Sequence, residues 1–290
     1  MIARVLCIAG VAIGLALCGC KPSEGPAPAP VTPAFPQPTQ VDPQKAFDQW
    51  KALMTNPEAA RTGSVHIQLA AAMKERAPEL IPKMVDLMLD PATQPESRFL
   101  ILNSLEVAQT PELYPRLLDL TKPEVDPSIR SGVVIMLKTS TEPAVIARIR
   151  ELVNDPERRV KLAAMMVLSE TGDKESRTAL QEYYFTDGLP AEHRARIVQS
   201  LALTPETSDL KVLTTALGDA AIGEEARLVA TGAIGRVADP SGLAALDQIA
   251  QGNESADLKK WAASAAKVIR EKSGSAGDAT NQPASAPETR

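Results

Sequence analysis

Aromatic residues are scarce in this chain, and so is any alternation of apolar with polar residues. Phe, Trp and Tyr make up 3% of the 290 residues, and no sustained alternating stretch is present. A β-sandwich or barrel needs such alternation and is usually rich in aromatic and β-branched residues. Ala, Leu, Val and Ile dominate instead. Small aliphatic side chains suit closely packed helices, so the composition argues against a β architecture and predicts an all-α fold.

Motifs that carry chemistry are also few. His66 and His193 are the only histidines, and neither lies in a His-Glu-x-x-His or cysteine-rich frame. Ser264 and Lys267 match the Ser-x-x-Lys motif of penicillin-recognising enzymes, but the Ser-Asp-Asn and Lys-Thr-Gly partners of that motif are missing. No nucleophile elbow, phosphate-binding glycine loop or dinucleotide fingerprint occurs. We therefore predict that the protein is not an enzyme and holds no metal or other cofactor.

An excess of positive charge is likewise missing. The formal net charge is −5, and binding to a phosphate backbone needs a basic surface. We expect no nucleic-acid partner. The charged runs Glu224-Glu225 and Glu157-Arg158-Arg159 lie at expected helix starts. Acidic residues there suit the positive end of the helix dipole, so we interpret both runs as solvated caps.

The N-terminus has the pattern of a targeting segment. A basic start is followed by an apolar run, Val5 to Leu17, that is too short to span a bilayer comfortably. The run ends in Leu17-Cys18-Gly19-Cys20, which resembles the lipobox of bacterial lipoproteins: an aliphatic residue at −3, a small residue at −1, then the acylated Cys. Cys20 fits this frame, whereas Cys18 would put Leu17 at −1. The resemblance implies a lipoprotein signal peptide over residues 1–19, with an ordinary secretory signal or a buried apolar helix as alternatives.

Acylation of Cys20 would decide where the protein lies. Cys7 and Cys18 would leave with the signal, so the mature chain would have one Cys and no intramolecular disulfide. Several acyl chains, palmitate among them, give firm anchoring to membrane lipid. By analogy with the same lipoproteins, Lys21 favours the outer membrane. We expect a place in the cell envelope, on the periplasmic face of the outer membrane if the cell has one.

The two ends of the chain have unusual compositions. Residues 20–43 contain eight prolines, which favour extended polyproline II structure and predict a tether. This segment is interpreted as a spacer, with recognition of its prolines by a binding domain as the alternative. Residues 273–290 are rich in Ser, Ala, Gly and Pro with almost no apolar bulk. They predict a disordered tail.

Between these ends the sequence repeats. Six blocks recur with a period of 31 to 33 residues, which is typical of stacked helix pairs that cannot bury their apolar faces alone. A basic residue opens the first helix in five blocks, and an aliphatic residue follows it seven positions later. The basic residues are Arg98, Arg130, Lys161, Arg194 and Arg227, and the aliphatic residues are Leu105, Leu137, Leu168, Leu201 and Ile234. We predict that the aliphatic set forms the core.

The same spacing places the helices. Residues 44–58 form an amphipathic lead-in helix with Phe47, Trp50 and Leu53 on one face. The repeat array covers residues 59–272 and ends in a first helix that has no second helix. Second helices are expected at about residues 112–121, 143–153, 174–185, 206–217 and 240–251.

Several of these blocks carry a family pattern. Asp126-Pro-Ser-Ile-Arg130 and Asp155-Pro-Glu-Arg-Arg159 combine an acid, Pro and a basic residue near a helix start, and Thr171-Gly-Asp and Ala238-Asp-Pro form turns. The pattern resembles HEAT repeats in their short bacterial form, and departs from it in the first block and around Gly188. The resemblance implies an all-α, right-handed α-α superhelix (a HEAT/ARM-like solenoid) of antiparallel helix pairs, with second helices lining the concave face. Tetratricopeptide repeats have a similar period, but their aromatic signature is missing.

One polar stripe is a candidate for protein binding. Lys83, Arg116 and Arg148 are repeat-equivalent positions on second helices, and acids follow three residues later, at Asp86, Asp119 and Glu151. Such i,i+3 pairs contribute a few tenths of a kcal/mol each. The stripe is either a salt-bridged solvated face or a groove for an acidic partner.

The family resemblance also implies a function. HEAT proteins are scaffolds, so we expect a membrane-anchored scaffold for protein–protein interaction whose partner is an unknown envelope protein or peptide. One alternative is an accessory or ligand-carrying subunit of an envelope enzyme or assembly, since some HEAT-like proteins resemble bilin lyases. The other is a purely structural spacer.

Overall fold

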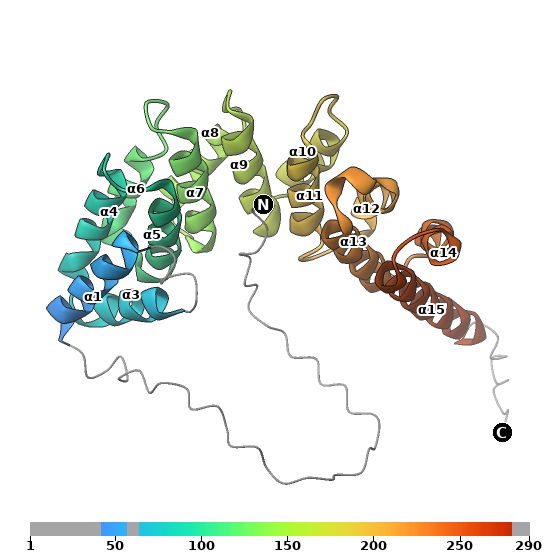
Figure 1. Ribbon diagram of the computed structural model, residues 1–290. Coiled ribbons are helices and arrows are strands. Elements are labelled where there is room, and N and C mark those ends of the chain that lie inside the picture. Colours follow the sequence, from blue (N-terminus) through green and yellow to red (C-terminus); the bar gives the residue numbers. More distant parts are fainter. Residues whose placement is uncertain (1–41, 57–63, 280–290) are drawn as a thin grey trace, which may run out of the picture. The chain divides into compact units, whose positions relative to one another are not determined.

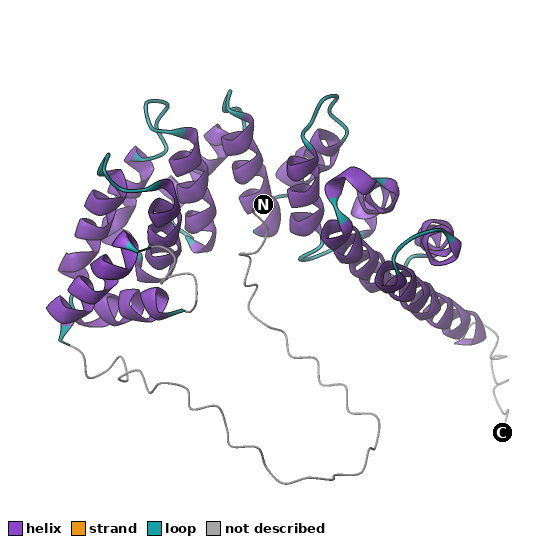
Figure 2. Ribbon diagram, viewed as in Figure 1, coloured by secondary structure: helices purple, strands orange, loops and turns teal. Residues whose placement is uncertain are grey.

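The computed structural model describes residues 42–56 and 64–279, and every regular element in that part is helical (Figure 2). The predicted signal peptide, Cys20, nearly all of the predicted tether and residues 280–290 lie outside the described residues. The fold class is confirmed as an all-helical solenoid of paired helices. Repeats of this kind bury a continuous core only by stacking on their neighbours.

The helices form two sets that alternate along the chain (Figure 1). The lead-in helix and the first helices of the repeats are α1 (Pro43–Thr55), α3 (Val65–Arg76), α5 (Pro95–Ala108), α7 (Pro127–Met136), α9 (Arg158–Glu170), α11 (Ala191–Leu201), α13 (Glu224–Val237) and α15 (Ala256–Ala279). The second helices are α4 (Ile81–Leu89), α6 (Tyr114–Asp119), α8 (Pro143–Leu152), α10 (Lys174–Tyr184), α12 (Leu210–Gly218) and α14 (Leu243–Gln251). Short 3₁₀ turns precede α4, α6, α12 and α14.

Helix starts follow from local sequence. The Asp126 carboxylate accepts a hydrogen bond from Ser128 N at 2.8 Å, and Pro127 occupies the first helical position. Asp173 caps α10 in the same way through Ser176 N. These caps satisfy backbone donors that have no partner inside the helix. At the end of α13, Ala238 adopts a left-handed conformation with φ of 57°, which a residue with a Cβ adopts only at a cost.

The predicted core is confirmed. Leu105, Leu137, Leu168, Leu201 and Ile234 are each 0 to 3% exposed. The core forms two apolar clusters that meet on α9. Val160 and Val167 of this helix belong to the cluster that runs back to α1, whereas Leu162 and Met165 belong to the cluster that runs on to α15.

Both ends of the array are capped. At the first end, α1 packs against α3 and α5, and the buried Trp50 donates from Nε1 to Ser104 Oγ at 3.0 Å. The helix α1 lies where the lead-in helix was expected, at Pro43–Thr55 instead of residues 44–58. At the other end, the prediction of a disordered tail from residue 273 is wrong for its first seven residues, since α15 continues to Ala279. Propagating an established helix costs much less than nucleating one, and Ser273 Oγ bonds to Ile269 O.

Candidate functional site

Of the three ion pairs expected along the predicted basic stripe, two are wrong. Arg116 does not pair with Asp119; it reaches back to the preceding repeat, where it contacts the Asp86 carboxylate and donates to Pro82 O at 3.0 Å. Lys83 forms no ion pair with Asp86 in the part of the chain that the structure describes. Its Nζ lies 5.8 Å from the centre of the Phe47 ring.

Arg148 forms the expected ion pair and also contacts the preceding repeat. Its guanidinium pairs with Glu151 at 2.6 Å, which confirms the predicted i,i+3 contact. It also donates to the carbonyl and hydroxyl oxygens of Thr121, at 3.0 and 2.9 Å, in the preceding repeat. Arg116 and Arg148 therefore connect successive second helices. The contacts favour the salt-bridged interpretation of the stripe over a free acidic-partner groove.

A second set of arginines closes each repeat internally. The first-helix residues Arg130, Arg194 and Arg227 pair with carboxylates 25 to 27 residues further on, after the second helix. Those partners are Asp155 at 2.5 Å, Asp219 at 2.8 Å and Glu254 at 2.7 Å. Hydrogen bonding from Arg227 lowers the pKa of Glu254.

The sequence analysis identified these arginines as the basic residues that open first helices, but it did not identify their carboxylate partners. A search for acidic residues 25 to 27 positions after these arginines could have found them. The other two basic residues of this set have different partners. Arg98 donates to Asp90 O at 3.2 Å, and Lys161 Nζ lies 5.6 Å from the centre of the Tyr183 ring.

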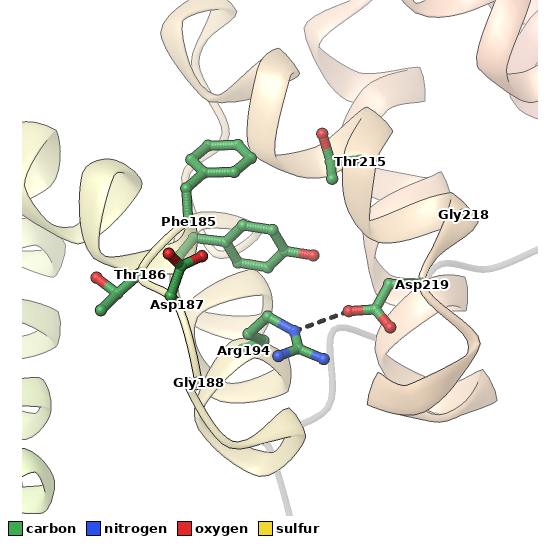
Figure 3. A pocket seen from close by; sticks show the side chains of 9 residues that line it. Phe185, Thr186, Asp187, Gly188, Arg194, Thr215, Gly218 and Asp219 are labelled. Atoms are coloured by element: carbon green, nitrogen blue, oxygen red, sulfur yellow. Dashed lines mark hydrogen bonds and ion pairs between the residues drawn. The ribbon is translucent and has the colours of Figure 1, made fainter.

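A shallow pocket lies where α10 ends and α11 begins, next to the end of α12 (Figure 3). Its volume is about 530 Å³. Figure 3 shows Arg194 and Asp219 facing one another across it, joined by the 2.8 Å contact, while Phe185 and Thr215 lie further up. The half-exposed Phe185 ring has Lys211 Nζ 4.9 Å from its centre. The long turn at Gly188, where the repeat pattern breaks, forms one side of the pocket.

Tyr184 is the most perturbed titratable group in this pocket. Its side chain is buried, and burial, aided by the negative charge of Asp219, raises its pKa to about 12. Arg194 opposes this shift. A phenol with such a pKa stays protonated near neutral pH and does not act as a base. The pocket residues also include two threonines and two aspartates, but no histidine or cysteine.

Metal and membrane features are also limited within the described ranges. No group of three or more His, Cys, Asp or Glu residues in 42–56 and 64–279 could hold a metal ion. In the same residues, no helix combines the length and the apolar character needed to cross a membrane. His66 lies on α3 and His193 on α11, so the structure does not bring them together. Cys20 lies outside the described residues.

A match to a known protein family agrees with the repeat architecture. Residues 114–188 match the family of HEAT repeats. No curated protein sequence is similar enough to this chain to count as a match. Human deoxyhypusine hydroxylase, solved in complex with glycerol, is 19% identical with a TM-score of 0.37, over 80% of this chain and 94% of that one. A likeness at this level supports no inference about activity. The family match supports HEAT repeats over residues 114–188, and such repeats suggest a helical-repeat scaffold.

Proposed function

We propose that this protein is a lipid-anchored scaffold of the cell envelope that binds a protein partner along its helical array. The array itself is the observation that carries the proposal. Each repeat adds one first helix and one second helix to a continuous structure, and buried or half-buried arginines such as Arg116, Arg130 and Arg148 hold the repeats in place. A stack of this kind offers an extended, preorganised surface, and preorganisation reduces the entropic cost of binding.

The anchor rests on the lipobox around Cys20 and is testable alone. We expect the Cys20→Ser variant, produced in a bacterium fed a palmitate analogue, to lose the label and enter the soluble envelope fraction. The matched Cys18→Ser variant should keep both the label and its membrane association. Label that persists in the Cys20→Ser protein would rule the anchor out.

The scaffold role is tested by photo-crosslinking in intact cells. A photoreactive amino acid is placed at exposed positions on the second helices (Lys83, Arg150) and on the first helices (Phe99, Lys260). If a partner binds, we expect a discrete crosslinked species from one set of positions and none from the other. If no position on either set gives a discrete product, the purely structural spacer is the better account.

The pocket next to Phe185 favours a second candidate, a carrier of a small ligand for an envelope enzyme. Its volume of about 530 Å³ lies in the range of small-molecule sites. A ligand seated there should raise the melting temperature of the wild-type protein, and Phe185→Ser should remove that shift. If the protein gains no colour and its melting temperature does not shift with any ligand of a screen, this candidate is excluded.

A further inference from the structure

Three buried arginines of this chain have carboxylate partners, whereas a group of cations on α9 and α11 forms no ion pair within the described residues. Arg130, Arg177 and Arg227 each pair with an acid. By contrast, Arg158, Arg159 and Arg196 form no ion pair within the described residues. Together with His193 they make up what we call the basic cluster: Arg158, Arg159, His193 and Arg196. The net charge of the chain is negative, so overall composition does not account for this local excess.

The start of α9 is electrostatically unfavourable. Arg158 and Arg159 are its first two residues, its first turn contains no acid, and the side chain of the capping residue Glu157 forms no cap hydrogen bond. Two cations therefore lie at the positive end of the helix dipole, where anions are favoured. Glu157 lies at the helix start as expected and is exposed, but its side chain does not cap the helix by a hydrogen bond.

Contacts hold this arginine pair between neighbouring repeats. Arg159 Nη1 donates to Ser128 Oγ at 2.8 Å, at the start of α7, and Arg158 Nη1 donates to Gly188 O at 3.5 Å, just before α11. The cluster itself thus lies on the first halves of two successive first helices, α9 and α11, and Ser128 at the start of α7 supplies a hydrogen-bond acceptor next to it. Both arginines are exposed, so their remaining donors face solvent.

The α11 side of the cluster is partly desolvated. Burial is the main cause that lowers the pKa of His193, and the charges of Arg196, Arg159 and Arg158 lower it further. Burial and Arg159 lower the pKa of Arg196 as well. The Nδ1 atom of His193 is buried and has no hydrogen-bond partner.

Few acids face this group of cations. Glu192 is the acid that favours the charged forms of His193 and Arg196. Three further carboxylates nearby are engaged: Asp126 caps α7, Asp155 pairs with Arg130, and Asp219 pairs with Arg194. An anion arriving at the cluster would therefore meet three arginines, opposed by the carboxylates of Glu192 and of the exposed Glu157.

We propose that the basic cluster is a docking site for an acidic segment of a partner protein, an inference that rests on the proposed scaffold function and specifies one surface for it. Packed helices lie about 8–10 Å apart, and an extended chain rises about 3.3 Å per residue. Carboxylates about three residues apart on one extended segment therefore reach successive repeats. The spread of the three arginines over two successive first helices, α9 and α11, favours such a segment over a single small anion.

The test uses a fluorescein-labelled peptide of ten glutamates and fluorescence anisotropy with the full chain. The double variant R158S/R159S removes two exposed cations from the cluster. The control K259S/K260S makes the same change of charge on another first helix, α15, whose two lysines form no ion pair within the described residues. We expect R158S/R159S to weaken binding about tenfold or more, equivalent to about 1.4 kcal/mol, and the control to change it less than twofold. Added salt should weaken wild-type binding, because exposed charges are screened.

A second readout comes from NMR of the imidazole signals, which are simple to assign because the chain has two histidines. A bound carboxylate segment next to His193 favours the imidazolium form. The peptide should therefore raise the pKa of His193 and leave that of His66 unchanged. A purely structural role for the cluster predicts no change at either histidine.

Three results would overturn the site: no binding of the peptide to the wild-type protein at millimolar concentration, equal weakening by the two double variants, or binding to phosphatidylglycerol vesicles without binding to the peptide. The last result would identify an anionic lipid surface instead. Photo-crosslinks from the second helices in any of these cases would keep the scaffold function while removing this site.

Discussion

The buried pair of Arg177 and Asp209 gives the most quantitative test of how the repeats are held together. Asp209 is 0% and Arg177 6% exposed. The Asp209 carboxylate accepts hydrogen bonds from Arg177 at both oxygens, from Gln181 Nε2 at 2.7 Å and from Glu206 N at 2.7 Å. Arg177 also donates to Thr204 O at 2.7 Å. One carboxylate thus joins α10 to the turn before α12.

Asp209→Asn keeps the size of the side chain but removes its charge. Arg177 would then keep only the longer, 3.7 Å contact with the exposed Glu206 carboxylate, and the new amide NH₂ would face donors. Removing one partner of a buried ion pair typically costs about 3–5 kcal/mol, a large part of the roughly 5–15 kcal/mol that stabilises a domain. The matched control is Arg150→Gln, which breaks the 3.3 Å contact with Asp173 made by a side chain that is 63% exposed. Such surface pairs contribute about 0–1 kcal/mol.

The free energies of unfolding are measured by urea denaturation, followed by circular dichroism. We expect a loss of at least about 3 kcal/mol for Asp209→Asn and less than about 1 kcal/mol for Arg150→Gln. The double variant R177M/D209L should recover part of the loss, because no unpaired charge remains buried. Equal, small losses in Asp209→Asn and Arg150→Gln would refute the argument that this pair holds the repeat together.

Two further predictions concern single residues. The pKa of Glu170 is raised, because the effect of burial exceeds the opposite effects of the hydrogen bond from Ser200 and the charge of Lys138. The folded state therefore disfavours the carboxylate, and this destabilisation is absent below the unfolded pKa of about 4.3 and complete above the folded pKa. Glu170→Gln should raise the melting temperature near neutral pH and change it little at about pH 4, and the reverse order would contradict the assignment. Ala238→Gly should stabilise the protein by about 1 kcal/mol, because glycine adopts the left-handed conformation without a Cβ clash; an unchanged urea midpoint would count against this.

The sequence was sufficient to predict the fold because the repeat encodes it locally. Leu105, Leu168 and Ile234 recur at one register, and a residue that is buried in one repeat is buried in the next. Helix starts were predictable where Asp precedes Pro, as at Asp126. The end of α15 was not, because low-propensity residues beyond residue 272 extend a helix that stronger residues have already nucleated.

Side-chain partners were harder to predict than helices. The i,i+3 rule gave Arg148 with Glu151 correctly and failed for Arg116, because it considers one helix in isolation. In a stack, an arginine can reach the preceding repeat, and the choice between Asp86 and Asp119 depends on how far the helices are offset. The pocket next to Phe185 and the basic cluster depend on the same stacking. Only the break in the pattern at Gly188 signalled that this region differs.

The central claim is that the protein is an array of repeats that stabilise one another only through their neighbours. Leu168→Ala and Ile234→Ala each remove a buried side chain, at a cost of about 2–5 kcal/mol. Hydrogen exchange of both variants, followed helix by helix, tests the claim most directly. Leu168→Ala should reduce protection on α9 and on the helices that contact it, α7, α8, α10 and α11, whereas Ile234→Ala should mainly reduce protection from α13 to α15. Equal loss of protection along the whole chain in both variants would show a single cooperative globule and contradict the solenoid account.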